Sequence, residues 1–210
     1  MKRLLTITLA ATAAAANAVV FDSFTDGDFS IDLFDTQFDG RAMSASVPGG
    51  VRTTFSQILV NPFDLGANQS ITSGAYSVGG DFGVETFSGI TYGYDTSGIQ
   101  KELNLDLSDQ NAFAFDFIGT DQPLSVGVLV SSGSATDTQS ITIGPSSGLK
   151  YIPFSAFSGI DFSDVDRLTF SFRTNPSGDF ALNSIGAVPE PASMAALGLG
   201  VAALLRRRRK

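Results

Sequence analysis

The chain has 210 residues and a formal net charge of −8, and it contains no His, Cys or Trp. These absences exclude imidazole general bases, thiol nucleophiles, disulfides and His/Cys zinc sites. Of the acidic residues, 18 are Asp and only 3 are Glu, and Asp favours turns over helix interiors. With 18 Phe and 43% apolar residues, the chain is expected to bury a core and to fold as one mainly β domain.

The N-terminus has the three zones of a secretory signal peptide. Two basic residues precede an apolar, Ala-rich run, and the small residues Ala16 and Ala18 stand just before Val19. Signal peptidase reads small side chains at these two positions, so we expect cleavage between Ala18 and Val19. The alternative is an Ala-rich N-terminal helix that is retained. We assign residues 1–18 as a signal peptide, with signal peptidase as a partner and export by the general secretory route.

Charge in the middle of the chain is strongly negative. Residues 19–188 carry six Lys or Arg and twenty Asp or Glu, a net charge of −14. Such a body repels phosphate backbones and anionic lipid surfaces, which argues against nucleic acid as a partner. It suits a protein of the cell exterior.

Apolar and polar side chains alternate with period two along this middle part, as they do in strands. Gly, Pro, Ser or Asp bounds each run, which favours an antiparallel β-sandwich in residues 19–187. The expected core includes Phe113, Phe115, Phe117, Leu168, Phe170 and Phe172. The expected strands are 19–24, 28–34, 41–47, 51–60, 69–78, 84–94, 102–108, 112–118, 124–131, 138–143, 149–154, 166–174 and 179–187.

Several short segments of the body resemble the jelly-roll β-sandwich of galactose-binding-like domains and carbohydrate-binding modules. They are Phe21–Gly27, Tyr92–Asp95, Leu105–Ser108, Tyr151–Phe157, Asp166–Phe170 and Asp179–Ile185. The resemblance implies a jelly-roll fold, and a fold does not carry a function with it. Those modules often stack sugars on Trp, which this chain lacks.

The C-terminus has three zones in order. A proline-stiffened segment is followed by 14 small or apolar residues, 192–205, and then by five cations. As a helix the apolar segment is about 21 Å long, so it spans a hydrocarbon core of about 30 Å only marginally, and the cations hold its end in the cytoplasm. The expected sorting motif is Val188, Pro189, Glu190 and Pro191, and the expected membrane stop is Arg206, Arg207, Arg208, Arg209 and Lys210.

Residues 188–210 resemble the PEP-CTERM sorting signal, which is also called the ice-binding protein C-terminal domain, with its Pro-Glu-Pro motif at 189–191 and its basic tail at 206–210. The resemblance implies recognition by exosortase, a membrane-embedded cysteine transpeptidase of Gram-negative bacteria that make exopolysaccharide. It also implies a transient inner-membrane anchor, followed by processing and release or attachment outside the cell. The alternative is a plain membrane anchor with an incidental Pro-Glu-Pro triplet.

Metal and cofactor sites have weak support. The Asp-rich opening comprises Asp22, Asp26, Asp28, Asp32, Asp35 and Asp39. It is not an EF-hand, because Ile31 stands where that loop needs Gly and Gln37 where it needs Glu. Solvated turns and strand edges explain these Asp residues, so we expect no cofactor. By resemblance to jelly rolls that pin their terminal strands, a structural Ca²⁺ between Asp22 or Asp28 and Asn183 is the alternative.

Catalytic residues are not expected. Glu85 and Glu102, the only glutamates before the tail, are interpreted as solvated strand residues. The run from Gly79 to Gly83 lacks phosphate-loop spacing and is interpreted as a turn, and a Ser triad needs His. Tyr76, Tyr92, Tyr94 and Tyr151 are candidates for a sugar-stacking platform or for ordinary cross-strand packing.

The sequence therefore predicts a secreted, exosortase-sorted, non-catalytic protein of the cell surface or exopolysaccharide matrix. The alternative is a lectin-like, carbohydrate-binding module, with exopolysaccharide as its partner.

Overall fold

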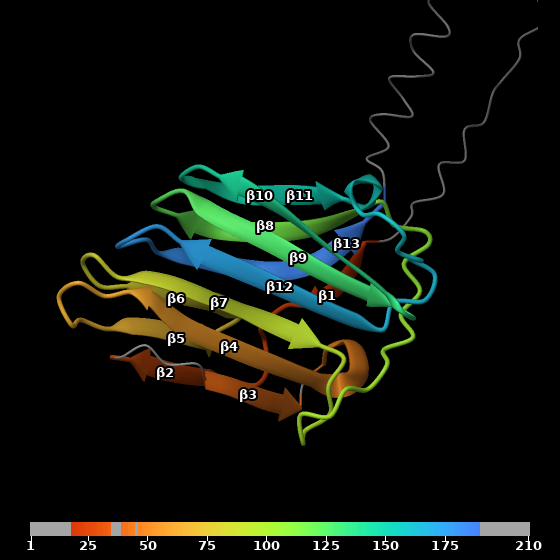
Figure 1. The fold of residues 1–210 in the computed structure, drawn as a ribbon, viewed down its shortest axis with the longest axis horizontal. Helices are drawn as coiled ribbons and strands as arrows, with labels where there is room; N and C mark the ends of the chain where they lie inside the picture. Colours follow the sequence, from red (N-terminus) through yellow and green to blue (C-terminus); the bar gives the residue numbers. More distant parts are fainter. Residues whose placement is uncertain (1–17, 35–38, 45, 190–210) are drawn as a thin grey trace, which may run out of the picture.

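The computed structural model describes residues 18–34, 39–44 (backbone only) and 46–189, and these residues form two antiparallel sheets packed face to face (Figure 1). Sheet A has the order β11-β8-β13-β6-β5-β2, and β1 pairs with β13. Its strands are β1 (Val19–Asp22), β2 (Phe29–Leu33), β5 (Ala67–Thr72), β6 (Ala75–Gly80), β8 (Ala112–Thr120), β11 (Ser146–Pro153) and β13 (Phe180–Val188).

Sheet B has the order β10-β9-β12-β7-β4-β3. Its strands are β3 (Asp39–Ser44), β4 (Val51–Val60), β7 (Glu85–Tyr92), β9 (Leu124–Ser132), β10 (Ala135–Ile143) and β12 (Arg167–Thr174). Two 3₁₀ turns, Pro48–Gly50 and Phe154–Ala156, complete the described elements.

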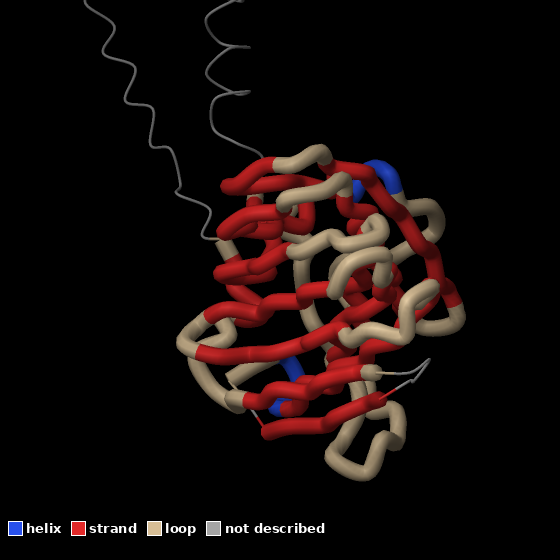
Figure 2. The backbone as a smooth tube through the Cα atoms, turned by 90° about the vertical axis from the view of Figure 1, so that its left-hand side faces the viewer, coloured by secondary structure: helices blue, strands red, loops and turns tan. Residues whose placement is uncertain are grey.

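The order of the strands shows how the chain is wound. When the two strand orders are written one above the other, each strand in the order of sheet A stands opposite a strand of sheet B that directly precedes or follows it in the chain, for example β8 opposite β9. The chain therefore passes repeatedly from one layer to the other (Figures 1 and 2). This winding is that of a jelly-roll β-sandwich, and the predicted fold class is confirmed. The predicted signal helix and C-terminal hydrophobic helix lie outside the described residues. Within the described part, no helix is long and apolar enough to cross a membrane.

The core lies between the sheets and is built around phenylalanine. All six predicted core residues are at most 1% exposed, so the predicted inward face of β8 and β12 is confirmed. The Phe170 ring lies 5.7 Å from both Phe113 and Phe115, with edge-to-face geometry in each pair. Such contacts stabilise a core beyond the burial of area alone.

Two predicted strands were wrong. The predicted strand 69–78 is a hairpin of β5 and β6, because Ser73 and Gly74 take φ values of 53° and 80° and turn the chain back. The predicted strand 102–108 is a loop with one isolated bridge, from Leu105 to Val165. Its alternating leucines still pack on the core, since Leu107 is 1% exposed and Leu103 and Leu105 pack against the core cluster.

Candidate functional site

The described residues that border the two predicted processing sites lie side by side in sheet A. Val19, the expected first residue after signal cleavage, pairs with Ala187 of β13, although the two are far apart in sequence (Figure 1). Ala18 is exposed just before this strand, while Ala16 lies outside the described residues. Both cleavage events are therefore expected at the same end of the domain.

The expected sorting motif starts inside sheet A. Val188 is half-buried and pairs with Ala112, and its carbonyl accepts a hydrogen bond of 2.8 Å from the Asn111 amide. Pro189 follows directly and is half-buried. The rest of the motif, Glu190 and Pro191, and the membrane stop Arg206, Arg207, Arg208, Arg209 and Lys210 lie outside the described residues.

A buried ion pair fixes β1 to the other sheet. The Arg52 guanidinium donates to both carboxylate oxygens of Asp22, at 2.6 and 2.7 Å, and the Tyr92 hydroxyl donates to the same carboxylate at 2.7 Å. Arg52 and Tyr92 are 0% exposed and Asp22 is 2% exposed. Burial alone would lower the pKa of Arg52, but its hydrogen bonds and ion pair with Asp22 outweigh burial and raise it. The network therefore acts as a structural clamp and not as an acid or base.

Two buried tyrosines make the fold sensitive to high pH. Burial raises the pKa of Tyr76 to about 12, and burial together with the charge of Asp22 raises the pKa of Tyr92 well above its ordinary value of 10.0. The fold thus favours the protonated phenols. Their contribution to stability is complete below about pH 10, the pKa of an unfolded tyrosine, and is lost as the pH rises through the folded-state pKa.

We therefore expect the free energy of unfolding to fall above about pH 10, by up to about 1.4 kcal/mol per pH unit for each such tyrosine. Urea titrations at a series of alkaline pH values measure this slope. Tyr76→Phe, which removes one titrating group, should make the slope shallower. Ionisation of Tyr76 and Tyr92 near pH 10 without any loss of structure would contradict the prediction.

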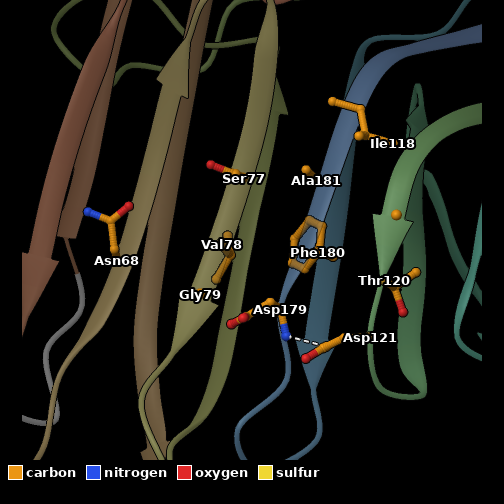
Figure 3. A pocket seen from close by; sticks show the side chains of 11 residues that line it. Asn68, Ser77, Val78, Gly79, Ile118, Thr120, Asp121, Asp179, Phe180 and Ala181 are labelled. Carbon is orange, nitrogen blue, oxygen red and sulfur yellow. Dashed lines mark hydrogen bonds between the residues drawn. The ribbon is translucent and has the colours of Figure 1, made fainter.

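A concave surface crosses the solvent face of sheet A. A hollow of about 570 Å³ lies over β6, β13 and β8, and one of about 350 Å³ adjoins it toward β2 and β5. Both share Asn68, Gly79 and Asp179, so we treat them as one and call it the sheet-A groove. Figure 3 shows the residues that line the larger hollow. The other lining residues of the groove include Asp32, Phe34, Ser77, Asp81, Ile118, Gly119, Asp121 and Ala181.

Small side chains on neighbouring strands form the floor of this groove. Ser77 of β6 is paired with Ala181 of β13, and Gly119 of β8 is paired with Ala181 on the other side. Two larger apolar side chains also line the groove and are open to solvent: Ile118 is 49% exposed and Phe34 is 66% exposed. A hollow with an exposed aromatic ring and polar groups can accommodate a hydroxyl-rich chain.

The predicted sugar-stacking tyrosines do not form a platform. Tyr76 and Tyr92 are 0% exposed, and Tyr94 is half-buried near Arg167, whose guanidinium donates to the Tyr94 hydroxyl at 3.4 Å. Only Tyr151, 44% exposed on β11, keeps the exposure that stacking requires. Tyr76 and Tyr92 are packing residues, which is the alternative that the sequence left open, because their rings contact core phenylalanines and the hydroxyl of each has a hydrogen-bond partner inside the core.

In the described part of the Asp-rich opening, Asp22 and Asp26 both form ion pairs with Arg52, at 2.6 and 3.5 Å. Asp22 is buried there, which corrects its interpretation as a solvated residue, and Asp26 also accepts a 2.7 Å hydrogen bond from the Ser46 amide. Asp35 and the side chain of Asp39 lie outside the described residues. Asn183 lies elsewhere and donates to Asp116 at 3.1 Å. Among the described residues, no group of three or more Asp or Glu is placed to hold a metal ion. The structural Ca²⁺ stays a prediction.

The remaining sequence interpretations concern groups considered for catalysis. Glu85 forms a 2.6 Å ion pair with the exposed Arg173, and Glu102 is exposed. Residues 79–83 form the end of β6 and the turn into β7, as predicted. Sequence reasoning missed that this turn contributes Gly79, Gly80 and Asp81 to the groove.

Comparison with known proteins gives one clear match. Residues 187–210 match the family described as the PEP-CTERM protein-sorting motif. The tail is a PEP-CTERM sorting motif. The predicted resemblance is confirmed, and the match begins one residue before the predicted boundary, at Ala187 of β13. A search of curated proteins found no match.

Similar solved structures are carbohydrate-related jelly rolls with low identity. The chain is 16% identical to the family 11 carbohydrate-binding module from Clostridium thermocellum in complex with a β-1,3-1,4-mixed-linked tetrasaccharide, covering 82% of this chain and 95% of that one, with a TM-score of 0.43. The family 11 module of the cellulosomal cellulase Lic26A-Cel5E of Clostridium thermocellum gives 16% identity, 84% and 96% coverage and a TM-score of 0.41. An exo-β-agarase structure is 12% identical, with 83% of this chain and 25% of that chain covered and a TM-score of 0.40. Similarity this loose shows nothing about ligand or activity.

Proposed function

We propose that the protein is an exported, non-catalytic protein that exosortase sorts to the cell surface or exopolysaccharide matrix of a Gram-negative-type bacterium. The sorting motif that directly follows β13 carries this proposal. The tail serves as a transient inner-membrane anchor, and signal peptidase and exosortase act at the same end of the sandwich, where Val19 and Ala187 are paired.

We further propose that the sandwich binds carbohydrate through the sheet-A groove. The supporting observation is the shape and chemistry of this surface: an open hollow of about 570 Å³ that continues into a second one, small floor residues and the exposed ring of Phe34. The aromatic face can stack on a sugar ring, and the polar groups can bind its hydroxyls. The ligand of a matrix protein with this site is an exopolysaccharide.

Filling the groove floor should abolish glycan binding without unfolding the domain. Ala181→Gln places a long, uncharged side chain on the floor, and we expect the affinity for a bound glycan to fall at least about tenfold, which is about 1.4 kcal/mol. The matched control is Thr138→Gln on the exposed face of β10 in sheet B, which should bind like the wild type.

The measurement is a glycan array on the full chain in detergent, followed by titration of the best ligand with both variants. Equal loss of binding in both variants, or binding to no glycan, would contradict the carbohydrate proposal. Release of reducing sugar from a bound glycan would contradict its non-catalytic part.

A further inference from the structure

The charged side chains of the sheet-A groove are all carboxylates. Asp32, Asp81, Asp121 and Asp179 line the two hollows, and no Lys or Arg is among the described lining residues. Backbone amides orient three of these carboxylates: Gly66 donates to Asp81 at 3.0 Å and Gly80 donates to Asp179 at 3.0 Å. The amide of Asp179 donates to Asp121 at 2.7 Å, which Figure 3 shows. The negative charge is therefore held in place along the groove.

The neutral polar groups of the groove also present acceptors. The Asn68 amide nitrogen donates to Asp32 at 2.8 Å and to Ser30 at 3.1 Å, and its oxygen faces the groove (Figure 3). The Thr120 hydroxyl donates to the Gln122 carbonyl, while in the Ser70–Ser77 pair, 2.8 Å apart, either hydroxyl can be the donor. The carboxylates and the Asn68 oxygen therefore favour a ligand that supplies hydrogen-bond donors, and an ammonium group is a donor without any acceptor.

The carboxylates also disturb one another. Burial raises the pKa of Asp179, and the charges of Asp121 and Asp81 raise it further, although the hydrogen bond from Gly80 acts the other way. An anionic ligand would add to this repulsion, and a neutral one would cover the carboxylates without compensating their charge. A cationic ligand would relieve the repulsion.

We propose that the sheet-A groove selects a polysaccharide whose sugars carry free amino groups, such as a glucosamine polymer, with its ammonium groups directed at the carboxylates beside Asp179. This inference rests on the proposed carbohydrate binding and names the ligand class of the same groove. The net charge of −14 over residues 19–188 also attracts such a polycation from a distance.

The test compares two oligosaccharides that differ only in charge. A glucosamine oligomer and its fully N-acetylated counterpart of the same length and linkage are titrated into the full chain in detergent at about pH 5.5, which lies below the range in which amines titrate and above the ordinary pKa of Asp. We expect the glucosamine oligomer to bind at least about tenfold more tightly, and this advantage to shrink as salt is added.

Two matched double variants distinguish the effect of the groove carboxylates on binding from the effect of the protein's net charge. The double variant Asp81→Asn, Asp179→Asn removes two charges and retains hydrogen-bond acceptors. It should reduce the affinity advantage of the glucosamine oligomer over the acetylated one to below about twofold. Its thermal midpoint should be no lower than that of the wild type, because a repulsion between carboxylates is removed. Asp161→Asn with Asp164→Asn makes the same change in net charge on the β11–β12 loop and should leave the advantage intact.

The possible outcomes distinguish failure of the charge selectivity from failure of the carbohydrate proposal. An equal affinity for the two oligomers, or an equal loss in both double variants, overturns the charge selectivity and leaves carbohydrate binding standing. Binding of neither oligomer and of no other glycan on the array overturns the carbohydrate proposal itself. Tight binding of the glucosamine oligomer that only the groove variant weakens supports the inference.

Discussion

Replacing Arg52 with alanine should lower the free energy of unfolding by about 3 to 5 kcal/mol. The substitution leaves the Asp22 carboxylate, 2% exposed, without the guanidinium that bonds both of its oxygens. A buried charge that loses its partner keeps its desolvation cost, so β1 should detach from the sandwich. Urea unfolding followed by fluorescence of the buried tyrosines measures the change.

The matched control is Arg173→Ala, which breaks an ion pair of the same length at the surface. The Arg173 Nε atom lies 2.6 Å from Glu85 Oε1, the same separation as between Arg52 and Asp22, but the Arg173 side chain is 59% exposed. Water replaces an exposed partner at little cost, so this variant should lose at most about 1 kcal/mol. If the two variants were destabilised equally, the buried clamp would not hold β1 as described.

Replacing Pro189, Glu190 and Pro191 with alanine should block processing completely while leaving membrane insertion intact. The apolar segment 192–205 and the basic run after it are unchanged, so the chain still inserts. Exosortase loses the motif it is expected to read, and the full-length precursor should accumulate in the inner membrane. A fractionated blot in a host that has exosortase measures this.

Changing the membrane stop should produce a different failure. Replacing the five cations 206–210 with serine removes the electrostatic hold on a helix of about 21 Å in a core of about 30 Å, so membrane retention should fall. Normal processing of the alanine variant, or the same phenotype for both variants, would contradict the separate roles of the two zones.

The sequence was sufficient to predict the sandwich because its strong signals are local. Alternating phenylalanines such as Phe113, Phe115 and Phe117 define an inward face whatever strands lie beside them. The hairpin of β5 and β6 was missed because Ser73 takes a positive φ that its residue type seldom adopts, so the run looked continuous. Asp22 was taken as solvated because its partner, Arg52, belongs to another sheet.

The sheet-A groove could not be predicted for a related reason. It brings together Asn68, Asp121 and Asp179, which lie far apart in the chain, and its floor is made by small residues that carry no motif. The order of strands in sheet A decides which residues meet there, and a single sequence does not give this order. The sorting motif is the opposite case, because its zones follow one another within 24 residues and need no tertiary structure to be read.

Sorting by exosortase is the central claim, and a comparison of two hosts tests it most directly. The wild-type chain is expressed in a host that has exosortase and in one that lacks it, and each is fractionated and blotted. We expect a shorter form outside the inner membrane in the first host and the longer, membrane-retained precursor in the second. Equal mobility and equal membrane retention in both hosts would contradict the account and leave the tail as a plain anchor.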